Sequence, residues 1–265
     1  MTDTNGLCVL RGSGNGGAVG ISAHKEGYYW SSGYREQFTN LVGVADRRWE
    51  PWNPTVDVTL VRIGSPRPMY AKMLRDIPIP DEGGPVGFDL SAGDWVAPHG
   101  GGKHGDLVFH YESKPEGTIS TRYGPVQTYD YSLTISTSNE SDGLLAVSSP
   151  LRGGHSALRL PKQAPKDGYV PTRTMRVYRD RDMQSHSDIR EDRNYFLRVR
   201  TRKDEDGNIV SALYGKIHGD FTFDHSGRLS FTYYLNPEPN EQNVEFDPTE
   251  NLFRNLSSLQ DVREP

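Results

Sequence analysis

The chain has 265 residues, of which 34% are hydrophobic, 10% aromatic and 25% charged, and its formal net charge is −5. A chain of this length can bury a sizeable core as one domain, and its aromatic and β-branched content excludes a disordered protein. No apolar run approaches the roughly 18 residues that a membrane span needs, and no basic block indicates a nucleic-acid interface. The 28 glycines and 18 prolines favour many turns between short strands.

The polar start of the chain, Met1 to Gly6, lacks the apolar segment of a signal peptide, and the single cysteine, Cys8, excludes an internal disulfide. A glycine-rich run follows at residues 12–17 with the sequence GSGNGG, which satisfies the dinucleotide-binding pattern G-x-G-x-x-G. That pattern requires an amphipathic helix directly after it, but Gly20 and Gly27 interrupt the segment that follows. We therefore expect a glycine turn and no nucleotide cofactor.

A group of aromatic residues comes next, in a segment that otherwise has the composition of a loop. Its members are Tyr28, Tyr29, Trp30, Tyr34, Trp49 and Trp52. Large rings in polar segments either cap the open end of a hydrophobic core, which is their more common fate, or stack on the apolar faces of pyranose sugars. We identify these residues, Tyr29 apart, as candidate ligand-binding residues, with core packing as the alternative.

Alternating hydrophobic and polar residues predict strands through the middle of the chain. The predicted strands are 56–63, 107–111, 128–137, 144–148, 157–160 and 172–178, and clusters of Gly, Pro and Asp bound them. Helical periodicity is confined to 34–40, 69–76 and 251–259, which predicts a few short peripheral helices. A Pro-rich stretch at 161–171 is a candidate hinge, although a long loop within one sandwich explains it equally well.

Histidines and carboxylates gather between residues 94 and 112. The set contains Asp94, His99, His104, Asp106, His110 and Glu112. In an extended strand His104, Asp106 and His110 share one face, and two imidazoles with a carboxylate suit an open metal site. The spacing matches no standard metal motif, so we predict solvated turn residues and no metal.

The run His99-Gly100-Gly101-Gly102 resembles the oxyanion loop of α/β-hydrolases, with Ser156 in the place of a nucleophile. The nucleophile elbow requires G-x-S-x-G followed by a helix. Residue 158 is leucine instead of glycine, and Pro161 prevents a long helix. The sequence therefore argues against a serine hydrolase.

The clearest pattern is an antiparallel meander from Arg193 to Asn236. Its predicted strands are 195–201, 209–217, 221–223 and 229–235, separated by polar turns. Alternation places Arg198 and Arg200 together on the polar face of the first strand. They belong to an arginine-rich region with interleaved acidic residues, which is typical of a salt-bridged surface. The same face is suited to the carboxylates or sulfates of an acidic polysaccharide, so both arginines join the candidate ligand-binding residues.

These patterns predict an all-β protein: an antiparallel, jelly-roll-like β-sandwich with a few short peripheral helices, formed by residues 1–265 as a single domain. None of the catalytic motifs considered above fits the sequence around it, so we assign no catalytic residues. We expect an extracytoplasmic (secreted or periplasmic) module that binds polysaccharide or another glycan without a cofactor or nucleic-acid partner. A polysaccharide lyase or glycoside hydrolase on the concave face of the same fold is the alternative, and a structural or assembly protein without a small-molecule site is a third possibility.

Overall fold

The computed structural model describes residues 2–11, 18–37, 55–80, 83–114, 117–149 and 155–265. The chain divides into two compact units. Unit 1 is Met1–Val61 with Arg152–Ser156, and unit 2 is Arg62–Leu151 with Ala157–Pro265. Neither boundary falls in the 161–171 stretch that the sequence offers as a hinge. The organisation of residues 1–265 as a single domain stays a prediction.

Unit 1 contains a small antiparallel sheet in the order β1-β2-β10. Its strands are β1 (Ala18–Ala23), β2 (Ser31–Gln37) and β10 (His155–Ser156). The turn before β2 is held by a backbone hydrogen bond from the Tyr29 N–H to the Val61 carbonyl (2.8 Å). The candidate residues Tyr28 and Trp30 lie between β1 and β2, and Tyr34 lies within β2.

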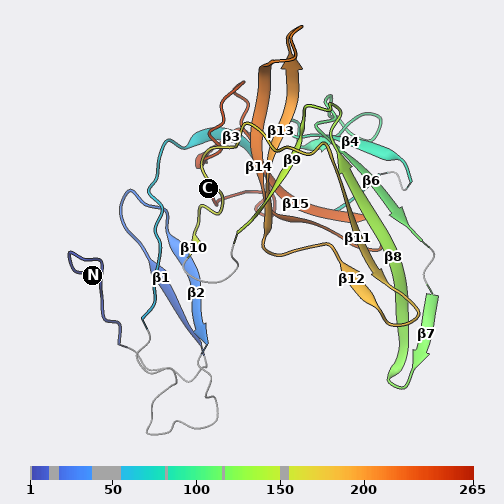
Figure 1. Cartoon of the computed structure of the whole chain (residues 1–265), viewed down its shortest axis with the longest axis horizontal. Coiled ribbons are helices and arrows are strands. Elements are labelled where there is room, and N and C mark those ends of the chain that lie inside the picture. Colours follow the sequence, from blue (N-terminus) through green and yellow to red (C-terminus); the bar gives the residue numbers. More distant parts are fainter. Residues whose placement is uncertain (1, 12–17, 38–54, 81–82, 115–116, 150–154) are drawn as a thin grey trace. The chain divides into compact units, whose positions relative to one another are not determined.

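Unit 2 contains two larger sheets (Figure 1). The seven-stranded sheet has the order β12-β11-β8-β6-β4-β5, and β7 pairs with β8. Its strands are β4 (Pro85–Asp89), β5 (Asp94–Trp95), β6 (Leu107–Ser113), β7 (Gly117–Thr121), β8 (Gly124–Ser136), β11 (Thr172–Arg179) and β12 (Ser185–Ser187). The central pairs β6–β8 and β8–β11 are antiparallel, which agrees with the alternation in the sequence.

The six-stranded sheet has the order β16-β3-β15-β14-β13-β9. Its strands are β3 (Arg67–Pro78), β9 (Gly143–Ser148), β13 (Arg193–Lys203), β14 (Ile209–Phe223), β15 (Arg228–Leu235) and β16 (Phe246–Asn251). All of its pairs are antiparallel except β16–β3. The two sheets of unit 2 make a sandwich-like, all-β fold.

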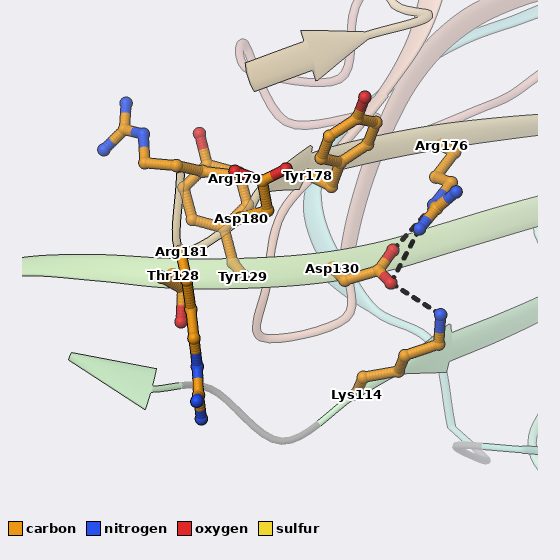
Figure 2. A pocket seen from close by; sticks show the side chains of 9 residues that line it. All are labelled: Lys114, Thr128, Tyr129, Asp130, Arg176, Tyr178, Arg179, Asp180 and Arg181. Carbon is orange, nitrogen blue, oxygen red and sulfur yellow. Dashed lines mark hydrogen bonds and ion pairs between the residues drawn. The ribbon is translucent and has the colours of Figure 1, made fainter. Parts of the chain in front are cut away.

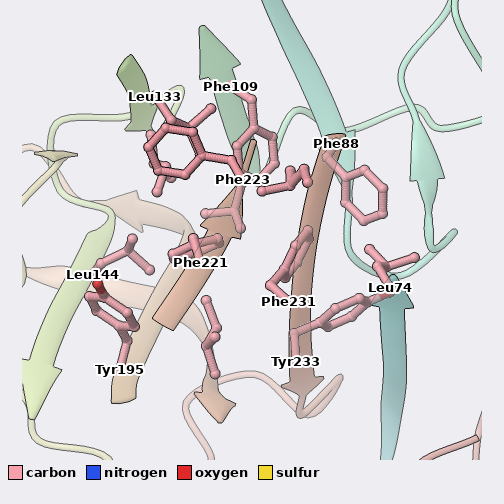
Figure 3. Close-up of a cluster of buried hydrophobic side chains, with 14 of the residues drawn as sticks. Leu74, Phe88, Phe109, Leu133, Leu144, Tyr195, Phe221, Phe223, Phe231 and Tyr233 are labelled. Atoms are coloured by element: carbon pink, nitrogen blue, oxygen red, sulfur yellow. The ribbon is translucent and has the colours of Figure 1, made fainter. Parts of the chain in front are cut away.

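The main hydrophobic core draws on both sheets of unit 2 (Figure 3). The seven-stranded sheet contributes Phe88 and Phe109, whose rings meet Phe231 of β15 at centroid distances of 5.7 and 5.6 Å. A hydrogen bond from the Tyr233 hydroxyl to the Leu90 carbonyl (2.8 Å) also joins the two sheets. These contacts tie the sheets into one packed unit.

A second cluster covers the other face of the six-stranded sheet. Phe196, Tyr214 and Tyr234 lie on that face, beneath Leu160 and Val262. Several central strands of this sheet are therefore buried on both sides. Strands of this kind carry hydrophobic residues on both faces, which weakens the alternation from which strands are predicted.

The predicted meander is confirmed, with one change. β13, β14 and β15 pair in sequence, and the polar turns lie where the sequence places them. Gly207 and Gly227 adopt φ values of +84° and +68° there, a conformation that glycine reaches without steric cost. The predicted strands 209–217 and 221–223 are one strand, β14, with an irregular register between His218 and Thr222. Four of the other predicted strands correspond to β6, β8, β9 and β11, whereas 56–63 and 157–160 form no named strand.

The predicted helices are wrong in the described part of the chain. Residues 69–76 lie in β3. The sequence predicted a helix there because Met69 and Ala71 are buried on one face of the strand and Leu74 on the other, so hydrophobic and polar residues do not alternate. Residues 34–37 lie in β2, and 38–40 fall outside the described residues. In the 251–259 segment, Asn251 ends β16 and residues 252–259 form bends and turns. Within the described ranges we find no helix long and apolar enough to cross a membrane.

Candidate functional site

An open groove of about 470 Å³ lies beside β8 and β11 (Figure 2). Its lining side chains come from the residue that follows β6, from these two strands and from the turn that follows β11. They are Lys114, Thr128, Tyr129, Asp130, Arg176, Tyr178, Arg179, Asp180 and Arg181. We call this feature the Tyr178 groove. It combines tyrosine rings with charged groups and lies wholly within unit 2.

The carboxylate of Asp130 organises the charges of the groove. Arg176 donates to it twice, from Nε to Oδ1 (2.8 Å) and from Nη2 to Oδ2 (2.9 Å), and Lys114 Nζ donates to Oδ2 (2.6 Å). The hydrogen bonds from Arg176, with help from Lys114, lower the pKa of Asp130 to about 2. Asp130 therefore remains charged near neutral pH and holds two cations in fixed positions.

Tyr178 lies between Arg176 and His186, on the side of β11 that faces away from the core, because Val177 beside it is buried. Arg176 Cζ is 4.8 Å from the centroid of the Tyr178 ring, and the His186 ring stacks on it at 5.7 Å. His186 Nε2 is 2.9 Å from Asp188 Oδ1. Burial raises the pKa of Asp188, but hydrogen bonds from the Arg176 backbone and from His186 outweigh it and leave the pKa below its usual value. A base with a carboxylate partner thus adjoins the groove.

The far end of the groove is formed by the turn between β11 and β12. Asp180 Oδ1 accepts hydrogen bonds from the backbone N–H groups of Asp182 and Gln184 (both 2.9 Å) and so holds this turn. Arg179 Cζ lies 5.3 Å from the centroid of the Tyr129 ring. Two hydrogen bonds therefore hold the backbone at this end. Arg179 contacts an aromatic ring there, whereas Arg176 is bound to a carboxylate.

The structure partly describes the predicted aromatic group. The side chain of Trp30 is 51% exposed, so it is not part of a closed core. Tyr28 is partly buried, and Lys25 Nζ lies 4.5 Å from its ring centroid. Tyr29 is buried. Tyr34 belongs to β2, but its side chain is not described, and Trp49 and Trp52 lie outside the described residues.

Arg198 does not lie on the exposed face that the strand pattern predicts. It is only 8% exposed and donates hydrogen bonds to the carbonyl oxygens of Ser141 (2.9 Å from Nε) and Lys166 (2.6 Å). Its guanidinium lies 4.6 Å from the centroid of the Tyr169 ring. The donors of Arg198 are thus used within the fold, since the cover over the second cluster buries this face of β13.

Arg200 also departs from the predicted pattern, and it no longer shares a face with Arg198. Its φ of +56° coincides with a shift in the β13–β14 register after Val199. Its guanidinium reaches the seven-stranded sheet, donating to Asp106 Oδ1 from Nε (2.7 Å) and to Asp89 Oδ1 (3.1 Å). Arg200 therefore links the two sheets, and the role in ligand binding predicted for it and for Arg198 stays a prediction.

The histidine-rich segment does not converge as an extended strand would require. Asp106 is buried against Arg200, ahead of β6, whereas His110 Nε2 lies 3.2 Å from the Gly83 carbonyl. His104 instead approaches Asp89. In the part of the chain that the structure describes, no group of three potential metal ligands converges.

The glycine run 100–102 has a packing role. A Cβ on Gly100 would lie 2.5 Å from the Trp95 carbonyl oxygen, and one on Gly102 would lie 2.8 Å from Asp89 Cβ. The Gly101 N–H donates to Asp94 Oδ2 (2.8 Å). The run therefore wraps tightly around the β4–β5 turn, which supports the sequence argument against an oxyanion loop.

A second set of titratable side chains is enclosed on the covered face of the six-stranded sheet. Lys216 has no exposed surface, and its Nζ lies 4.6 Å from the Tyr234 ring centroid with no hydrogen-bond partner among the described residues. Burial lowers the pKa of Lys216 to about 7. The Tyr234 hydroxyl lies 3.0 Å from His218 Nδ1 and donates to the Glu264 carbonyl (3.2 Å). Because these groups are closed off, we assign them to stability.

Comparison with protein-family models, with curated proteins and with solved structures finds no match for this chain. The geometry of the molecule itself therefore carries the functional argument. Tyr178, Asp130 and Lys114 are not among the site residues predicted from the sequence, because only strand pairing brings them together. The sequence signal that could have identified this site is the row of polar residues that alternates with hydrophobic ones in 128–137 and 172–178.

Proposed function

We propose that the protein is a glycan-binding module and that the Tyr178 groove is its saccharide site. The observation that carries the proposal is an open groove in which one partly exposed tyrosine ring, that of Tyr178, lies among an ordered set of charged donors and acceptors, with the Tyr129 ring packed against the core at the far end. Saccharides offer apolar C–H faces for aromatic rings and hydroxyls for such polar groups. The groove supplies both kinds of contact.

The order of the polar groups supports this proposal. Asp130 is already held by Arg176 and Lys114, so a ligand meets a fixed arrangement and does not have to order these long side chains itself. Fixing groups before binding reduces the entropy lost on association. Thr128 adds a hydroxyl at the same wall.

Trp30 offers a second aromatic surface within unit 1, and we propose it as a second contact for glycan. Its half-exposed indole meets the requirement that a sugar platform be open to solvent. Tyr28, Tyr34, Trp49 and Trp52 join it in the proposal, as the sequence suggests.

The test is affinity electrophoresis and calorimetry against a panel of neutral and acidic polysaccharides. Tyr178→Ala is expected to weaken binding about tenfold, which corresponds to the loss of about 1.4 kcal/mol of aromatic contact. Tyr123→Ala is the matched control, because Tyr123 is 84% exposed and does not line the groove. Trp30→Ala tests the second surface in the same assay.

The outcomes separate the alternatives. Loss of binding in Tyr178→Ala but not in Tyr123→Ala supports the groove. Loss in Trp30→Ala alone moves the site to unit 1. If the unaltered protein binds no polysaccharide in the panel, the proposal fails, and a structural or assembly role becomes the better hypothesis.

A lyase acting on the same polysaccharide is the second candidate, and one observation favours it. Elimination beside a uronate carboxylate needs a cation to neutralise that carboxylate, a base to take the proton from the adjacent carbon and an acid to protonate the leaving oxygen. Arg176, the His186–Asp188 pair and Tyr178 are neighbours of the required types. A hydrolase is less favoured, since Asp130 is tied to two cations and is a poor proton donor.

Incubation with polyuronates tests the lyase. The lyase would release unsaturated sugars that absorb in the ultraviolet, and His186→Gln would abolish the release while leaving binding in place. Binding without any such product identifies a binding module alone.

Two further parts of the proposal concern topology and location. The chain passes from β8 to β9 in the other sheet, returns to β11 beside β8, and continues to β13 beside β9. Such switching between sheets is typical of the jelly-roll topology that we propose. We also propose that the protein acts outside the cytoplasm, where polysaccharides are presented, and cell fractionation tests that location.

A further inference from the structure

The charge of the Tyr178 groove differs in sign from that of the chain as a whole. Four basic side chains line the groove against two acidic ones, an excess of two positive charges, whereas the formal net charge of the chain is −5. A local positive site on an acidic protein attracts anions selectively over a short range. The groove is therefore suited to an anionic ligand group.

Both carboxylates of the groove have partners within the protein. Asp130 is paired with Arg176 and Lys114, and Asp180 accepts backbone N–H groups of its own turn. Neither competes strongly for the remaining arginines. The charge of Arg176 and Lys114, in turn, is largely balanced by Asp130.

The arginines at the far end of the groove are different. Arg181 is exposed, and in the described part of the chain neither Arg179 nor Arg181 has an ion pair. Arg179 rests against Tyr129, which fixes the position of its guanidinium without neutralising it. Two guanidinium groups thus remain available at one end, beside aromatic surface.

We propose that the groove selects an anionic saccharide, one bearing carboxylate or sulfate groups, and that Arg179 and Arg181 recognise the charged group. The guanidinium fork matches either oxyanion with two parallel hydrogen bonds. This inference rests on the glycan-binding function proposed above and adds the chemical class of the ligand. Tyr178 contacts the sugar ring while the two arginines at the far end engage its charged substituent.

A nucleic acid is a poorer match for the same site. Binding along a phosphate backbone needs a row of several cations, and the free positive groups here number two on a protein of net negative charge. The rest of the surface would repel a long polyanion of high charge density. An anionic saccharide with spaced charges avoids that cost.

The experiment measures binding of the full chain to polygalacturonate, dextran sulfate, neutral dextran and single-stranded DNA at low and high salt. We expect at least one acidic saccharide to bind about tenfold or more tightly than dextran, with the preference reduced by salt. Arg179→Gln/Arg181→Gln should remove the preference and leave the weaker, charge-independent binding. Arg75→Gln/Arg263→Gln removes the same charge from exposed positions that do not line the groove, and it should behave like the unaltered protein.

The polymer that binds identifies carboxylate or sulfate as the recognised group, and either result supports the inference. Equal binding of dextran and the acidic polymers, unchanged in Arg179→Gln/Arg181→Gln, overturns it while leaving the glycan-binding function intact. DNA binding as tight as that of the acidic saccharides also overturns it. Failure to bind any polymer refutes the proposed function itself, so the two failures are distinguishable. Circular dichroism of each variant confirms that it is folded.

Discussion

Lys216 carries a basic group into a closed apolar cluster, where its amine has no hydrogen-bond partner among the described residues. Burial lowers its pKa from 10.5 in the unfolded chain to about 7 in the folded protein. Between these pH values the unfolded chain binds a proton that the folded chain does not. The free energy of unfolding therefore rises as the pH increases from about 7 to about 10.5, and below this range the folded state bears the full cost of the buried charge.

Replacing this lysine by an apolar side chain of similar size is expected to stabilise the protein. Lys216→Met should be more stable than the unaltered protein at neutral and lower pH, and the difference should shrink toward about pH 10, by at most about 1.4 kcal/mol per pH unit. Urea denaturation across this pH range measures it. Lys203→Met, at an exposed position, is the control, and an identical pH dependence of Lys216→Met and the unaltered protein would contradict the assignment.

Arg200 is half-buried, and its charge, unlike that of Lys216, has two buried carboxylate partners. Burial by itself raises the pKa of Asp89, but hydrogen bonds from the Lys103 backbone and the Ser91 side chain outweigh it and hold the pKa below its usual value. Arg200→Ala leaves two buried carboxylates without their cation and is expected to cost about 3 kcal/mol of stability. Chemical denaturation measures the loss. Arg202→Ala, two residues away and exposed, should change stability by less than about 0.5 kcal/mol.

Strand patterns predicted those elements that have one buried and one open face or a marked turn. The strands β8 and β11 and the meander were predicted because their polar and apolar residues alternate, and glycine-containing turns separate the strands of the meander. β3 was not, since Met69, Ala71 and Leu74 are buried on different faces and are good helix formers. The Tyr178 groove was hidden for another reason: residues 130 and 176 become neighbours only through β8–β11 pairing.

The glycine run before β6 gives a test at the level of one loop. Gly100→Ala and Gly102→Ala would place Cβ atoms 2.5 and 2.8 Å from Trp95 O and Asp89 Cβ, and each should destabilise the protein by about 1–3 kcal/mol. Gly101→Ala is the control within the run, because its Cβ would meet Asp94 Oδ2 at 3.5 Å, an ordinary contact. Thermal unfolding monitored by circular dichroism distinguishes them. Equal losses of stability at all three positions would show that close contacts of the added Cβ atoms do not cause the destabilisation.

The two compact units differ in the buried hydrophobic clusters that their described residues form. Both hydrophobic clusters are formed entirely by residues of unit 2, and the described part of unit 1 adds three short strands. The sequence predicted the β class because strand alternation is a local property. It did not predict the boundaries of the two compact units after residues 61, 151 and 156, because these depend on which segments pack together.

A chain beginning at residue 62 is expected to keep the fold of unit 2. Its thermal unfolding should stay cooperative, since removing residues 1–61 takes no residue from either cluster. It should also retain saccharide binding at the Tyr178 groove and lose any contribution of Trp30. Calorimetry and the polysaccharide assay measure the two properties, and a fragment without a cooperative transition would refute the independence of unit 2.

The ion-paired bridge at Arg200 has a consequence for how this protein can change over generations. Its three members stand at positions 89, 106 and 200, far apart in the sequence. Loss of Arg200 leaves two buried carboxylates without their cation, and loss of both carboxylates leaves a half-buried guanidinium without a counter-ion. Selection should therefore act on them as a set. Among descendants of the same ancestor, we expect these three positions to covary, with all three ionic residues kept or replaced together by apolar ones.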